Sequence, residues 1–99
     1  MNIEEILKEI LAIIERHTPK DTPVILFGSW AKGTAKKTSD LDIGILPKET
    51  LPGEAMTQII RQVDALPTLR KIDIVDLSSV EERFKNDALK NHKLLTPTQ

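Results

Sequence analysis

The stretch Phe27-Gly28-Ser29-Trp30-Ala31-Lys32-Gly33-Thr34-Ala35-Lys36-Lys37-Thr38-Ser39-Asp40-Leu41-Asp42-Ile43 joins the end of one apolar run to the start of another. A Gly-Ser step follows the first run, and two aspartates one residue apart enter the second. A glycine lets the backbone approach a ligand closely, and a helix that begins there directs free N–H groups at a phosphate. Carboxylates supply the oxygen ligands that Mg²⁺ prefers. The stretch therefore predicts a phosphate site beside a divalent-cation site.

The remaining sequence alternates between helical and strand patterns. We expect strands at 24–27, 41–46 and 71–77. We expect a helix over 3–17 capped by Asn2 and Glu5, a short helix over 30–32 capped by Ser29 and ended by Gly33, a helix over about 52–66, and a helix from a Ser78–Glu81 capping box to about Asn91. The tail, 93–99, adds a short strand or frays. This order predicts an α+β (α/β) fold in which a small mixed sheet is flanked by helices.

Period-two alternation predicts that the strand at 41–46 has two unlike faces. Its apolar face carries Leu41, Ile43 and Ile45, and its other face carries Asp40, Asp42 and Gly44. Helical spacing likewise predicts buried stripes, which comprise Met56, Ile59, Ile60 and Val63 in one helix and Val80 and Phe84 at the last one.

Length and composition limit the class of protein. Ninety-nine residues predict one domain over residues 1–99, and the net charge of −1 argues against a nucleic-acid binder. The longest apolar run, Ile10 to Ile14, has five residues, whereas a membrane span needs about 20. The chain lacks cysteine, and acidic residues stand near its start instead of the basic residues of a signal peptide. We therefore expect a cytoplasmic protein without a membrane anchor.

Asp73 is the candidate third acid. It interrupts the apolar residues Ile72 and Ile74, and it can face the aspartate pair if the two strands are neighbours. Two-metal phosphoryl transfer needs a carboxylate shared by both ions and further acids to complete each shell. Asp76 competes for this role, but alternation directs it to the opposite face. The alternatives without a function are that Asp40 and Asp42 lie on a solvated face and that Ser29 only caps a helix.

The Gly28-Ser29 step, ten intervening residues and then Asp40-Leu41-Asp42 resemble the signature of the DNA polymerase beta nucleotidyltransferase superfamily. The length and the single early helix resemble its minimal nucleotidyltransferases, which are often paired with an HEPN-domain toxin. The resemblance extends over nearly the whole chain, although only residues 28–43 carry specific motifs. It implies the polymerase-beta-type nucleotidyltransferase fold.

The resemblance also implies an activity: AMP transfer from ATP to a hydroxyl group, commonly of a tyrosine, on a partner HEPN toxin, so that the chain acts as an antitoxin. Gly28, Ser29 and Lys32 would bind the phosphates. Asp40, Asp42 and Asp73 would bind two Mg²⁺ ions, and Asp73 would also help to deprotonate the acceptor. In this interpretation ATP is a substrate and Mg²⁺ the cofactor.

The match has two departures, since many relatives carry arginine where this chain has Trp30 and Lys32. Lysine contacts phosphate without the bidentate geometry of arginine. Trp30 can pack in the core, stack on a base or meet a partner. This departure leaves open a second hypothesis, in which the chain neutralises its partner by binding alone. A third is nucleotidyl transfer to RNA or to a small molecule such as an aminoglycoside.

Size adds one expectation. Larger relatives bind the acceptor with a second domain, for which 99 residues leave no room. We therefore expect another chain, or a homodimer of this one, to provide most of the acceptor-binding surface.

Overall fold

A four-stranded mixed sheet forms the centre of the computed structural model, which describes residues 1–96. Its strands are β1 (Val24–Phe27), β2 (Leu41–Ile45), β3 (Ile72–Asp76) and β4 (Lys93–Leu94), and they lie in the order β3-β2-β1-β4. β2 pairs antiparallel with β1 and parallel with β3, and β4 adds to β1 in the antiparallel sense. The predicted mixed sheet is confirmed, and so is a short strand in the tail; residues 97–99 lie outside the described part.

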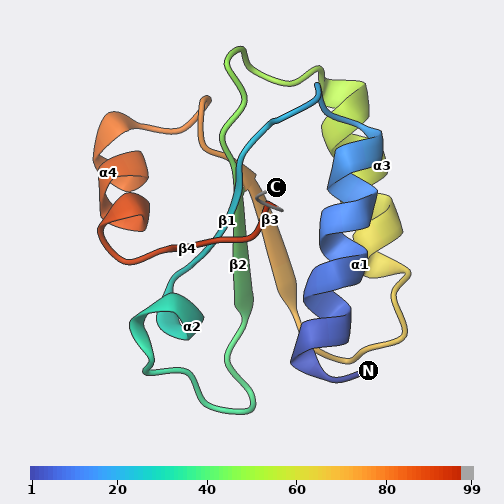
Figure 1. Cartoon of the computed structure of the whole chain (residues 1–99), viewed down its shortest axis with the longest axis vertical. Helices are drawn as coiled ribbons and strands as arrows, with labels where there is room; N and C mark the ends of the chain where they lie inside the picture. The colour runs from blue at the N-terminus through green and yellow to red at the C-terminus, as the bar shows by residue number, and fades with distance from the viewer. Residues whose placement is uncertain (97–99) are drawn as a thin grey trace.

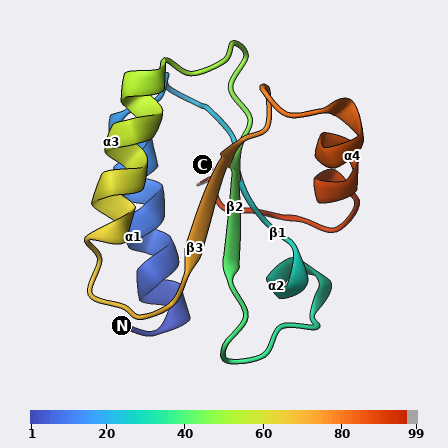
Figure 2. The same ribbon diagram turned by 180° about the vertical axis from the view of Figure 1, so that it is seen from behind.

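Within residues 1–96, four helices accompany the sheet: α1 (Ile3–Arg16), α2 (Ser29–Lys32), α3 (Gly53–Asp64) and α4 (Glu82–Lys90). α1 and α3 lie side by side on one face, and α4 lies on the other (Figures 1 and 2). The short α2 follows β1 directly, at the end of the sheet where β2 begins. None of the helices within residues 1–96 combines the length and the apolar character that crossing a bilayer requires.

The sheet separates two apolar clusters. The larger one lies beneath α1 and α3 and includes the three alternate residues of β2, Leu41, Ile43 and Ile45, all fully buried. The smaller one, on the α4 side, consists of Ile25, Phe27, Leu77 and Ala88. The alternation read from the sequence of β2 therefore corresponds to the two faces of the folded sheet.

Gly44 lies on the second face, and its lack of a side chain is required there. A methyl group on Gly44 would lie 2.5 Å from Leu77 Cδ1 and 3.2 Å from Ile25 Cγ1. The glycine therefore allows Leu77, fully buried, to pack directly against the sheet.

The capping predictions had different outcomes. Asn2 Oδ1 accepts from the Glu5 N–H at 2.9 Å and Glu5 Oε1 accepts from the Asn2 N–H at 3.1 Å, which confirms the first capping box. Ser29 is the first residue of α2 and Gly28 is its N-cap, so the cap assigned to Ser29 is wrong. Gly33 ends the helix in the left-handed region, as predicted.

The second capping box is also wrong. α4 begins at Glu82 with Glu81 as its N-cap, and no side chain caps it. Ser78 instead donates its hydroxyl to Asp76 Oδ1 at 2.6 Å, because the carboxylate two residues before it is the stronger acceptor.

Two residues predicted to be buried are exposed. Ile60 is 43% exposed and Phe84 47% exposed, although the Phe84 ring contacts the Phe27 ring edge-on with centroids 6.1 Å apart. α3 and α4 each have neighbours on only part of their circumference, so a stripe read from spacing is wider than the face that is covered. Ile59 and Val63 are buried as predicted, and Met56 and Val80 are partly buried.

Candidate active site

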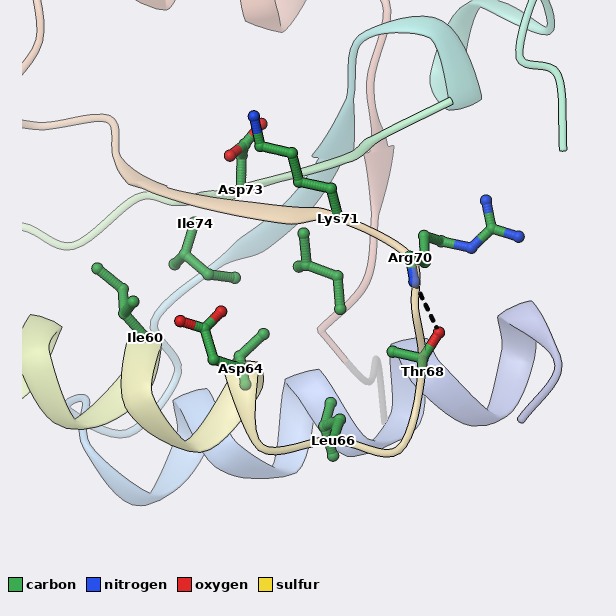
Figure 3. Close-up of a pocket in the computed structure, with 10 residues that line it drawn as sticks. Ile60, Asp64, Leu66, Thr68, Arg70, Lys71, Asp73 and Ile74 are labelled. Carbon is green, nitrogen blue, oxygen red and sulfur yellow. Dashed lines mark hydrogen bonds between the residues drawn. The ribbon is translucent and has the colours of Figure 1, made fainter. Parts of the chain in front are cut away.

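Two of the predicted acids are direct neighbours across the parallel strands. Asp42 of β2 is the register partner of Asp73 of β3. Figure 3 shows that Asp73 lies on the face of β3 away from α3, whereas Ile74 points toward α3. Asp40 precedes β2 by one residue and is partly exposed. The parallel pairing therefore brings together acids that are about thirty positions apart in the sequence.

Gly28, at the start of the predicted phosphate turn, lies beside these acids. Phe27 pairs with Asp42 across β1 and β2, so the next residue, Gly28, lies against the Asp42 carboxylate. Its φ of +71° and ψ of −152° favour glycine, and a methyl group there would overlap the Asp42 carboxylate. The missing side chain of Gly28 is therefore required by the Asp42 carboxylate, and its close approach to a phosphate stays a prediction.

Ser29 and Lys32 lie on the same turn. The carbonyl of Gly28 accepts from the backbone N–H groups of Ala31 and Lys32, at 3.1 and 3.0 Å, and so closes the first turn of α2. Lys32 is exposed and lines a hollow of about 150 Å³ together with Phe27, Gly28, Phe84, Asp87 and Ala88. Aromatic rings, a cation, the Asp87 carboxylate and a glycine backbone therefore line one hollow, and the glycine also adjoins Asp42.

The electrostatics of the site are unfavourable for an ionised Asp42. Burial raises the pKa of the Asp42 carboxyl above its ordinary value of 3.8, and the charges of Asp73 and then Asp40 raise this pKa further. Lys71 opposes the effect; its Nζ lies 4.0 Å from Asp40 Oδ2. A bound cation would relieve the repulsion among these carboxylates.

The acids fit magnesium by chemistry more than by a ready-made geometry. Within residues 1–96, no group of three His, Cys, Asp or Glu side chains has the arrangement of a metal site. The donors are nevertheless oxygen atoms alone, on one face, and their mutual repulsion is what an added cation removes. The three-carboxylate ligand set of Asp40, Asp42 and Asp73 remains a prediction.

Asp76, the competing acid, is held by the fold. It is 5% exposed; its Oδ2 accepts from the Leu51 N–H at 2.9 Å, and its Oδ1 accepts from the N–H and the hydroxyl of Ser78. These bonds join the end of β3 to the segment that leads into α3. A carboxylate satisfied in this way is structural, which agrees with the preference for Asp73.

Trp30 is also part of the fold. The indole packs against the larger apolar cluster, and its Nε1–H donates to the carbonyl of Ser39 at 3.2 Å. The Arg70 guanidinium lies over its ring, with Cζ 5.1 Å from the ring centroid. Sequence reasoning missed Arg70, since the only signal was an arginine two residues before the strand of Asp73, forty positions from Trp30.

A hollow of about 350 Å³ lies between α3 and the edge strand β3 (Figure 3). Of the six predicted site residues it includes only Asp73. The hollow is therefore a neighbour of the predicted site and not its centre.

Comparisons with known proteins identify the family and the fold. Residues 5–99 match the family model described as polymerase beta, nucleotidyltransferase. The protein adenylyltransferase MntA of Shewanella oneidensis is 30% identical over 92 residues, which are 92% of this chain. The chain spans 65% of that relative's length.

Two solved structures have the same fold. A toxin-antitoxin crystal structure with AMP-PNP superimposes with a TM-score of 0.73 at 30% identity, over 94% of this chain and 74% of the other. A complex of the tri-AMPylated Shewanella oneidensis HEPN toxin with its MNT antitoxin gives 0.71 at 25% identity, over 96% and 72%. The first structure contains an ATP analogue and the second an AMPylated toxin.

Proposed function

The chain belongs to the polymerase beta nucleotidyltransferase family, and from this premise we propose that it transfers AMP from ATP to a hydroxyl group of a partner HEPN toxin and thereby acts as an antitoxin. The observation that carries the proposal is the meeting of Gly28, Asp42 and Asp73 at one end of the sheet. A phosphate-binding turn beside several carboxylates is an unfavourable combination unless cations lie between them. Nucleotidyl transfer uses magnesium ions, which would be those cations.

The turn at the start of α2 binds the triphosphate in this proposal. The Gly28 backbone allows close approach, the Ser29 hydroxyl donates a hydrogen bond, and the exposed Lys32 contributes a positive charge. The aromatic ring of Phe84 lies beside the same hollow and offers an apolar surface to the nucleoside.

The three aspartates hold the metal and the acceptor proton. Asp40, Asp42 and Asp73 would ligate two Mg²⁺ ions, which, when bound, neutralise phosphate charge and favour the ionised acceptor. Asp73 is the acid on the edge strand β3 and is partly exposed, so an acceptor from another chain can reach it. It accepts the hydroxyl proton as the acceptor oxygen bonds to the α-phosphorus; the bond from that phosphorus to the bridging oxygen breaks, and pyrophosphate leaves.

The acceptor that we propose is a tyrosine. Its hydroxyl has an ordinary pKa near ~10 and therefore needs a base or a cation at neutral pH. The adenylyltransferase relative and the solved complex with a tri-AMPylated HEPN toxin support a toxin as the protein that bears the acceptor tyrosine. We also infer a cytoplasmic location, where ATP and magnesium are present.

The hypothesis that the chain neutralises its partner by binding alone loses its main support. That hypothesis rested on Trp30, and the indole of Trp30 packs in the fold and bonds to Ser39. The remaining argument in its favour is that the acids do not form a ready three-ligand site. A transfer assay distinguishes the two functions.

The assay incubates the purified chain and its HEPN partner with Mg²⁺ and ATP labelled on the α-phosphate. We expect label on the toxin with the wild-type chain and none with Asp40→Asn/Asp42→Asn. A control double variant, Glu9→Gln/Glu15→Gln, removes the same charge from exposed positions of α1 and should label the toxin normally. Neutralisation of the toxin by Asp40→Asn/Asp42→Asn without any label would replace the proposed function with binding alone.

A further inference from the structure

The loop before Asp40 is held from two sides. The carbonyl of Ser39 accepts from Trp30 Nε1 at 3.2 Å and from Arg70 Nη1 at 3.3 Å, and the same Arg70 nitrogen donates to the carbonyl of Lys37 at 2.8 Å. The peptide group of that Ser39 carbonyl leads directly into Asp40. Two donors, forty positions apart in the sequence, therefore meet at the link before a predicted metal ligand.

The two donors also support each other. The Arg70 guanidinium stacks over the Trp30 indole at 5.1 Å, and such a stack restricts the rotation of both side chains. The Arg70 N–H donates to Thr68 Oγ1 at 3.1 Å, which fixes its backbone (Figure 3). The carbonyl of the next residue, Lys71, accepts from the Leu41 N–H at 3.0 Å, immediately after Asp40. The residues on both sides of Asp40 are thus bonded to the segment 70–71.

The two donors come from different elements, and both elements are thereby connected to the loop before Asp40. Trp30 lies on α2, the helix of the phosphate turn, and Arg70 lies on the segment that enters β3 and continues to Asp73. Within the loop, the Ser39 N–H donates to the Lys36 carbonyl at 2.9 Å and the Ser39 hydroxyl accepts from the Lys36 N–H at 2.8 Å, so two hydrogen bonds connect these residues. A shift of α2 or of the β3 entry would therefore be transmitted to Asp40.

We propose that Trp30 and Arg70 are a positioning pair that fixes the Ser39–Asp40 link and so sets the Asp40 carboxylate relative to Asp42, Asp73 and the phosphate turn. The contacts stand independently of the reaction, but the consequence for catalysis rests on the proposed function. A loop staple without a positioning role would affect stability alone. A positioning pair must also affect how tightly the carboxylates bind magnesium.

The chain contains a built-in reporter for the test. Trp30 is the single tryptophan and the sequence has no tyrosine, so the intrinsic emission comes from the proposed pair itself. In Arg70→Gln we expect emission at longer wavelength, because water reaches the indole where the guanidinium lay. We also expect the half-saturating Mg²⁺ concentration, measured by calorimetry with a non-hydrolysable ATP analogue, to rise about ten-fold, since a charged donor is lost.

Two further variants make the test specific. Trp30→Phe keeps an aromatic ring and removes one neutral donor, so its half-saturating Mg²⁺ concentration should rise about five-fold. Arg83→Lys changes an exposed arginine of α4 and should leave both the emission and the Mg²⁺ requirement unchanged. In the transfer assay, Arg70→Gln should regain most of the wild-type rate at high Mg²⁺ concentration, which a misfolded protein would not do.

The outcomes separate the two proposals. A folded Arg70→Gln with a wild-type Mg²⁺ requirement, whether or not its thermal stability falls, would overturn the positioning pair; if it does not fold, Arg70→Lys is measured in the same way, with the same criterion. A wild-type chain that binds Mg²⁺ and the nucleotide but transfers no AMP would overturn the proposed function, while calorimetry would still decide about the pair. A wild-type chain that binds no nucleotide with Mg²⁺ would overturn both.

Discussion

The two faces of β2 are made from alternate residues of five consecutive positions, and they meet opposite surroundings. On one face Leu41, Ile43 and Ile45 are fully buried beneath α1 and α3. On the other, Asp42 lies beside Asp73, with burial and like charge raising its pKa. One face gains free energy by excluding water, and the other gives up some free energy to keep carboxylates together. The odd residues of the strand are therefore buried in the core, whereas of its even residues Asp42 belongs to the proposed site and Gly44 packs against Leu77.

The largest effect should come from breaking the apolar face. Ile43→Ala removes a side chain that is fully buried, and we expect it to lower the free energy of unfolding by about 2–5 kcal/mol. Denaturant titration followed by circular dichroism measures the change. Ile60→Ala, at a position 43% exposed, is the matched control and should cost less than about 1 kcal/mol. Equal losses in the two variants would contradict the burial of Ile43 in the core.

The next effect concerns the other face alone. Asp42→Asn keeps the size of the side chain and removes a predicted metal ligand. We expect AMP transfer to the toxin to fall at least about 100-fold while the protein remains folded. The initial rate with labelled ATP measures it, with Glu9→Gln on exposed α1 as the control. A loss below about three-fold would remove Asp42 from the site.

Gly28 tests the point where the turn touches the acid. Gly28→Ala introduces a methyl group onto the Asp42 carboxylate at a positive φ, so we expect a cost of about 1–3 kcal/mol in stability. Gly33→Ala is the control, because Gly33 also has a positive φ but nothing lies within 4 Å of an added methyl group. Its cost should be smaller, since it contains the strain without the overlap. Thermal unfolding of both variants measures the difference.

The smallest expected effect is a gain in stability, whereas the preceding variants lower stability or activity. The pKa of Asp42 is raised in the folded state, so the folded chain binds this proton more tightly than the unfolded chain does. This contribution favours folding below the ordinary value of 3.8 and is lost as the pH rises through the raised pKa. Asp42→Asn should therefore increase the melting temperature at about pH 7 by a few degrees, with a smaller gain at about pH 4. A lower melting temperature at neutral pH would show that the charge stabilises the fold.

The sequence predicted the parts of the molecule that depend on local patterns. Alternation in β2 predicted both faces correctly, and the spacing from Gly28 to Asp42 pointed to the turn and two acids of the proposed site. The Asn2–Glu5 capping box was predicted because its two partners are three residues apart. In each of these cases the decisive contacts lie within one element or follow from a regular strand.

Contacts that the patterns along the chain do not contain, some local and some between distant segments, explain what the sequence did not predict. Ser78 was available as a helix cap, but the Asp76 carboxylate binds it instead. Trp30 stands where many relatives carry arginine, and its contact with Arg70, forty positions away at the entry to β3, does not follow from any local pattern. The exposure of Ile60 and Phe84 depends on how far neighbouring elements extend, which spacing along one helix does not contain.

β3 carries two aspartates three residues apart that serve different purposes. Asp73 faces the proposed site, whereas Asp76 holds Leu51 and Ser78 and is 5% exposed. An alanine scan scored by survival of the toxin-producing cell would record both positions as indispensable. Only the amount of soluble protein in the cell would distinguish them, since the Asp76 variant should be degraded while the Asp73 variant accumulates in an inactive form.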